Sequence, residues 1–168
     1  MSWSTAVQKQ GRILALDYGR RKIGIALAGV ASRIAEPHDT LERINRNEDM
    51  RRLREFVCAN NVLQIVVGLP LRLDGTRGDM AEETTRFANR LRKELRIPVI
   101  MIDERLTSWE AERILEEELG RRITHETTHD GKRKHLRNAQ GKYTVDAIAA
   151  MVILREYLSR ESGTEEHA

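Results

Sequence analysis

Three acidic residues stand at the margins of apolar segments and are the first candidates for chemistry. Asp17 follows one apolar run, Glu104 follows another, and Asp146 begins a long apolar helical pattern. A carboxylate in a low-dielectric setting is costly unless it is paired or binds a cation. Three such residues favour a metal site if the fold brings them together. A turn former at Asp17 and loop charge at Glu104 are the simpler alternatives.

The segments around these acids alternate between short apolar runs and helical patterns. We expect strands over 13–16, 23–28, about 31–38, 65–67 and 99–102, and helices over 47–60, 77–95, 108–118 and 145–159. This order predicts a mixed α/β sheet with helical crossovers. The strands that end at Leu16, Val67 and Ile102 would run parallel, so their carboxyl ends would share one sheet edge. Asp17 and Glu104 would both lie at that edge.

The final helix supplies the third acid. Asp146 shares a helix face with Ala149, Ala150, Ile153 and Tyr157, and this face is otherwise apolar. The two alanines would allow the helix to approach the sheet closely, so the carboxylate would need a polar or charged partner there. Complementarity to the helix dipole in the first turn is the alternative explanation.

Composition limits the class of protein. A chain of 168 residues predicts one domain over 11–160, with a flexible arm at 1–10 and an acidic flexible tail at 161–168. No apolar stretch is long enough for a membrane span, and residues 1–10 lack a signal-peptide pattern. A single cysteine, Cys58, cannot form an internal disulfide. We therefore expect a cytoplasmic protein with no membrane partner.

Positive charge is concentrated in an expanded segment at 120–142. It holds seven basic residues against Glu126 and Asp130, an excess of five: Arg121, Arg122, Lys132, Arg133, Lys134, Arg137 and Lys142. Such a segment predicts a sequence-independent grip on a nucleic-acid backbone, and a solvated loop is the alternative. Arg105, next to Glu104, is a further candidate for a phosphate contact. His125 and His129 have a spacing that zinc sites use, but no third ligand stands near them.

Four motifs occur in a fixed order: LALDYGRRKIGIALA, IVVGLPLRLDGTRG, PVIMIDERLTSWEAERIL and TVDAIAAMVIL. Together they resemble the YqgF/RuvX family of the RNase H-like, Holliday junction resolvase-like superfamily, over roughly residues 11–158. The resemblance implies an RNase H-like five-stranded mixed sheet, with the first three strands antiparallel and two more parallel to the first. It also implies that Asp17, Glu104 and Asp146 are the catalytic and metal-binding acids.

The implied chemistry is phosphodiester hydrolysis with Mg²⁺ or Mn²⁺, since hard ions prefer carboxylate and phosphate oxygens. Asp17 would bridge two ions, and Glu104 and Asp146 would each complete one coordination shell. Residues two strands apart begin about 10 Å apart at the backbone, so Glu104 would have to reach inward. Relatives in the family usually have a lysine closer to the helix acid than Lys142 is to Asp146.

The resemblance implies a role in maturing the 5′ end of pre-16S rRNA, with pre-rRNA or the small-subunit precursor as partner. A resolvase-like endonuclease acting on DNA junctions and a non-catalytic RNA-binding assembly factor are the alternatives. The run from Asp17 to Gly24 also fits the phosphate loop of nucleotide-binding phosphotransferases, but those use two such domains and 168 residues allow one. We expect a monomer or a weak homodimer.

Overall fold

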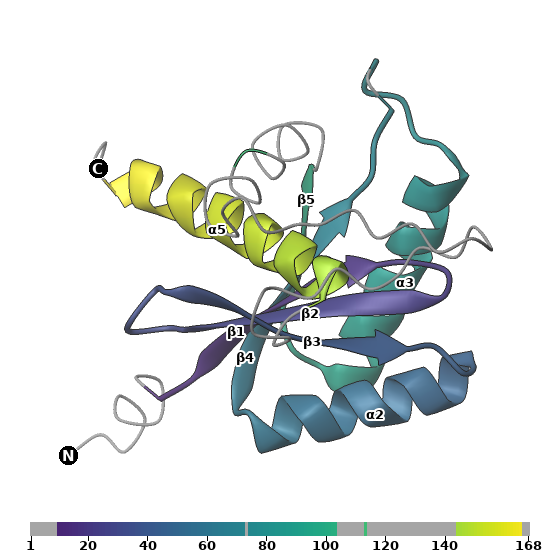
Figure 1. Ribbon diagram of the computed structural model, residues 1–168, viewed down its shortest axis with the longest axis horizontal. Coiled ribbons are helices and arrows are strands. Elements are labelled where there is room, and N and C mark those ends of the chain that lie inside the picture. The colour runs from purple at the N-terminus through teal and green to yellow at the C-terminus, as the bar shows by residue number, and fades with distance from the viewer. Residues whose placement is uncertain (1–9, 73, 104–112, 114–143, 166–168) are drawn as a thin grey trace, which may run out of the picture.

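The computed structural model describes residues 10–72, 74–103, 113 and 144–165. Its elements in chain order are β1 (Arg12–Tyr18), β2 (Lys22–Gly29), β3 (Ala35–Glu42), α2 (Arg46–Ala59), β4 (Val62–Leu69), α3 (Asp79–Leu95), β5 (Val99–Asp103) and α5 (Val145–Glu165). The strands form one five-stranded sheet in the order β3-β2-β1-β4-β5 (Figure 1). β1 pairs antiparallel with β2 and β2 with β3, whereas β4 and β5 run parallel to β1. The predicted mixed sheet is confirmed.

The two faces of the sheet carry different helices. Along β1 the side chains alternate, so Leu14 and Leu16 join a core with α2 and α3, while Ile13 and Ala15 join a core with α5. Among the described helices, α5 therefore covers one face, and α2 and α3 cover the other (Figure 1). Both cores are aliphatic, as the low aromatic content requires. A residue's position in the alternation thus decides which face it serves.

Strand β3 begins later than the sequence suggested. The prediction of a strand near 31–38 is wrong by several residues, because the chain turns before Ala35. Arg33 has a positive φ of 54°, and its amide donates to the carbonyl of Gly29 at 2.9 Å. The strand contains Pro37, which is tolerated because β3 is an edge of the sheet.

Helix α5 is longer than expected and ends at Glu165, not near 159. The first part of the expected flexible tail is therefore helical. Two interactions hold it: Arg33 forms an ion pair with Glu161 at 3.1 Å, and the Ser162 hydroxyl donates to the Leu158 carbonyl at 3.0 Å. Residues 1–9 of the expected arm at 1–10 lie outside the described residues, as does the expected helix at 108–118 apart from residue 113.

Tyr157 connects α5 to the sheet. Its side chain is buried, Gln64 Nε2 of β4 donates to its hydroxyl at 2.7 Å, and this hydroxyl donates to the Glu161 carboxylate. Burial raises the pKa of Tyr157 above its ordinary value, and the hydrogen bond to Glu161 raises it further. The neutral phenol is therefore the form that the folded protein favours.

We expect Tyr157→Phe to lower the free energy of unfolding at pH 8 by about 1 kcal/mol, the usual value of a hydrogen bond. Because the pKa is raised on folding, this contribution is complete below the unfolded pKa of about 10 and is lost as pH rises through the folded pKa. Urea unfolding of both proteins between pH 8 and 11 should show their difference shrinking. A difference that stays constant over this range would contradict the assignment.

Candidate active site

Asp17 is the next-to-last residue of β1, at the carboxyl end of the strand. It continues the alternation of Ile13 and Ala15, so it lies on the α5 face of the sheet. Its cross-strand partner is Gly24 of β2. The residue is half-buried, as expected for a carboxylate at the rim of an apolar core.

Gly24 places the start of α5 directly on the sheet. A Cβ atom at this position would lie 1.9 Å from the backbone oxygen of Asp146 and 3.1 Å from the nitrogen of Ala147. Only a glycine permits such an approach between strand and helix backbones. Because directly opposed residues have Cα atoms about 4.5–5.5 Å apart, the backbone of Asp146 lies one strand from Asp17. The structure therefore brings the backbones of two of the three predicted acids close together.

The start of α5 is fixed by two threonines. The Thr144 hydroxyl accepts a hydrogen bond from the Ala147 amide at 3.2 Å and so caps the start of the helix. The same hydroxyl forms a hydrogen bond with that of Thr40 in β3. Thr40 is the cross-strand partner of Gly24, and Gly24 is the partner of Asp17. These three residues form one row across β3, β2 and β1, and the start of α5 lies over this row.

On the other side of Asp17 the sheet offers no acid. Leu16 pairs with Val67, which makes Gly68 the next residue of β4 beside Asp17, and Gly68 pairs with Ile102 of β5. Ile102 belongs to the core on the α5 face, so the alternation directs its neighbour Asp103 to the opposite face. Glu104 follows directly and lies outside the described residues.

Two carboxylates at one point of the sheet are hard oxygen donors of the kind that Mg²⁺ and Mn²⁺ prefer. Asp17 and Asp146 therefore fit a divalent ion in chemistry. Within residues 10–72, 74–103, 113 and 144–165, no three His, Cys, Asp or Glu side chains gather closely enough for a complete site. A site with three protein ligands would need a residue outside these ranges.

The loop after β4 forms a tight turn. Asp74 accepts hydrogen bonds from the Thr76 amide at 2.9 Å and the Thr76 hydroxyl at 2.6 Å, and Gly75 has a φ of 85°. The Thr76 hydroxyl, followed by its amide, lowers the pKa of Asp74. Among the described interactions, Asp74 thus acts as the residue that shapes this turn.

The remaining predicted site residues lie outside the described part of the chain. These are Glu104, Arg105, Arg121, Arg122, Lys132, Arg133, Lys134, Arg137 and Lys142. In the other direction, the roles of Gly24 and Thr40 were not foreseen from the sequence. The available signal was a glycine inside an otherwise apolar strand, which often marks the close approach of another backbone.

Comparison with known proteins gives a consistent result. A family model described as "RuvX: Holliday junction resolvase" matches residues 11–160. A "Putative pre-16S rRNA nuclease" of Caldanaerobacter subterraneus is 37% identical over 91% of this chain and 99% of its own. A protein of the same name from Koribacter versatilis is 39% identical over 89% of this chain and 88% of its own.

A solved structure, Thermus thermophilus RuvC in complex with a Holliday junction substrate, aligns with a TM-score of 0.54 at 13% identity. The alignment covers 91% of this chain and 97% of that one. At this identity the likeness shows the fold alone, and it confirms the predicted RNase H-like class. None of the helices in the described ranges is long and apolar enough to cross a membrane.

We expect Gly24→Ala to force α5 away from the sheet, because the added methyl group would overlap the Asp146 carbonyl. Overpacking of this kind costs about 1–3 kcal/mol. Urea unfolding measures this loss, and faster amide hydrogen exchange in the first turns of α5 should locate it.

Gly163→Ala is the matched control, since a Cβ at this position of α5 meets nothing within 4 Å. This variant should be as stable as the parent or gain up to about 1 kcal/mol from helix propensity. Equal stability of the two variants would show that Gly24 does not support the helix.

Proposed function

Because this chain belongs to the RuvX family, we propose that it is a metal-dependent nuclease whose catalytic and metal-binding acids are Asp17, Glu104 and Asp146. One observation carries the proposal: the contact of Gly24 with the backbone of Asp146, which puts this acid one strand from Asp17. Carboxylate oxygens from these two residues are donors of the kind that a hard divalent cation prefers.

When bound, Mg²⁺ or Mn²⁺ would supply an activated water and neutralise charge on the phosphoryl oxygens. The residues of the chain have separate tasks. Asp17 is the central ligand, Asp146 approaches from the helix above it, and Glu104 contributes from the end of β5. Gly68 leaves the neighbouring position on β4 without a side chain, so a phosphate could approach Asp17 from this side.

The substrate we propose is the 5′ precursor segment of 16S rRNA, in the cytoplasm, with pre-rRNA or the small-subunit precursor as partner. The names of the two relatives support this choice. Within a nuclease domain over 11–160, the basic insertion at 120–142 and Arg105 would hold the backbone through phosphate contacts. We propose a monomer or weak homodimer, because strand trimming does not need two symmetric sites.

A DNA junction is the second candidate substrate. The description of the matching family model and the fold of RuvC favour it. A non-catalytic assembly factor is less favoured, because a protein that only binds polyanions gains nothing from Asp17 and Asp146 lying side by side.

We expect Asp17→Asn and Asp146→Asn each to lower the rate of metal-dependent cleavage by about a hundredfold or more. Loss of several kcal/mol of charge stabilisation has this effect. The assay uses labelled RNA that spans the 5′ precursor junction of 16S rRNA, a four-way DNA junction and single strands, with Mg²⁺, Mn²⁺ or EDTA.

Glu55→Gln is the matched control, since Glu55 is an exposed carboxylate on α2, across the sheet from α5. It should cleave like the parent. Cutting of the DNA junction alone would move the function to recombination. Binding of RNA without metal-dependent cutting in any variant would refute the nuclease.

A further inference from the structure

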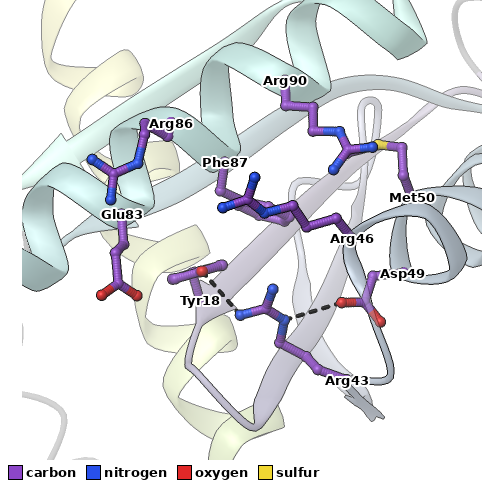
Figure 2. A pocket seen from close by; sticks show the side chains of 9 residues that line it. All are labelled: Tyr18, Arg43, Arg46, Asp49, Met50, Glu83, Arg86, Phe87 and Arg90. Carbon is purple, nitrogen blue, oxygen red and sulfur yellow. Dashed lines mark hydrogen bonds and ion pairs between the residues drawn. The ribbon is translucent and has the colours of Figure 1, made fainter.

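A second candidate site lies on the face of the sheet opposite α5. A cavity of about 410 Å³ opens between the end of β1, α2 and α3, and four arginines line it: Arg43, Arg46, Arg86 and Arg90 (Figure 2). Tyr18 and Phe87 form its apolar wall, with ring centroids 4.7 Å apart. This volume is in the range of small-ligand sites, and the concentration of guanidinium groups indicates an anionic ligand.

The two acids of the cavity are already neutralised. Asp49 is buried, accepts from Arg43 Nε at 3.1 Å and also accepts from the Ile44 amide at 2.9 Å. Glu83 forms an ion pair with Arg20 at 2.8 Å, and the hydrogen bond from Arg20 lowers the pKa of Glu83. Both carboxylates are therefore paired with arginines, Asp49 with Arg43 and Glu83 with Arg20.

The four arginines differ in whether their hydrogen-bond donors are already engaged. Arg43 binds Asp49 and the Tyr18 hydroxyl, and Arg90 forms an ion pair with Glu94 at 2.7 Å. Arg46 and Arg86 form no ion pair or hydrogen bond within the described part of the chain, and Figure 2 shows both among the side chains that line the cavity. They come from different helices, so the fold brings to one cavity two guanidinium groups whose donors are not engaged within the described ranges. The charge of Arg86 also acts on Glu83, which is already bound to Arg20.

The apolar wall is not arranged to stack a base. The Tyr18 ring packs against the ring of Phe87, and the Arg43 guanidinium lies 4.9 Å from the centre of the Tyr18 ring. Base stacking needs an open aromatic face. A phosphate oxygen, in contrast, suits the fork of donors that each arginine presents.

We infer that this cavity binds a backbone phosphate of a nucleic-acid strand through Arg46 and Arg86. The position supports this ligand: Tyr18 follows Asp17 directly, so the cavity and the acids lie at the same end of β1, on opposite faces. A strand cleaved at Asp17 would then be held a short distance from the scissile bond. The choice of a strand as ligand rests on the proposed nuclease function, but the phosphate site does not.

The first experiment tests the phosphate site without nucleic acid or metal. Inorganic pyrophosphate is titrated into ¹⁵N-labelled protein, and NMR follows the arginine side-chain Nε–H groups and the backbone amides. Saturable shifts should concentrate at Arg46, Arg86 and Phe87 and vanish in the Arg46→Ala/Arg86→Ala variant. Absence of such shifts in the parent would overturn the inference, whatever the nuclease assay shows.

The second experiment tests the strand. Binding of a labelled RNA and of the same sequence as DNA duplex is measured by fluorescence anisotropy in EDTA, over a range of salt concentrations. Loss of two phosphate contacts should reduce the slope of log K against log salt by about 1.4 for single strands and about 1.8 for duplex.

The control is Arg54→Ala/Lys93→Ala, which removes two charges from the same two helices at exposed positions that do not line the cavity. It should bind pyrophosphate like the parent and change the salt slope less. An equal effect of both double variants would mean diffuse charge and overturn the site. Pyrophosphate binding with an unchanged strand slope would overturn the strand as ligand. Metal-dependent cleavage by Asp17→Asn would refute the proposed catalytic acids. It would not change what the pyrophosphate titration and the salt slope say about the phosphate site.

Discussion

The close approach of a helix backbone to a strand backbone is the constraint on which the site depends. Gly24 is the third residue of β2, where any side chain would overlap the carbonyl of Asp146. The absence of that side chain lowers α5 onto the sheet and brings the helix acid beside Asp17. The hydrogen bond between Thr40 and Thr144 fixes the start of the helix at this height. The catalytic geometry we propose thus follows from a backbone contact that contains no catalytic group.

The period of two along β1 separates two kinds of chemistry. Asp17 falls on the α5 face, where Asp146 begins the helix, and Tyr18 falls on the face of α2 and α3 with the arginines. Opposite charges are thereby kept apart by the thickness of a sheet, although they start from neighbouring residues. A register slip of one residue would exchange them, so the buried pattern of β1 also protects the polarity of both sites.

Much of the fold could be predicted from the sequence because its signals are local and strong. The runs at 13–16, 65–67 and 99–102 are apolar and bounded by charge or glycine, and each lies within a strand. The errors occurred where tertiary contacts decide the outcome. The chain turns at Arg33 through a positive φ that nothing in its residue type announces, and α5 continues past 159 because Arg33 and Ser162 hold its last turns. The arginine cavity was not foreseen, since its members come from separate elements.

The placement of the acids also explains why we assign an acid of α5 to the proposed site. Beside Asp17 on β4 stands Gly68, and the facing residue of β5 is Ile102, so the parallel half of the sheet offers no carboxylate in this row. A ligand from β5 would have to come from beyond its end and span two strand spacings, about 10 Å, to reach Asp17. The antiparallel half compensates, because Gly24 allows the helix acid to approach from directly above. In a site built in this way, the distance from Asp17 to the acid of α5 is short and the distance to a ligand from the end of β5 is long. Its geometry therefore depends more on how α5 is seated than on any single carboxylate.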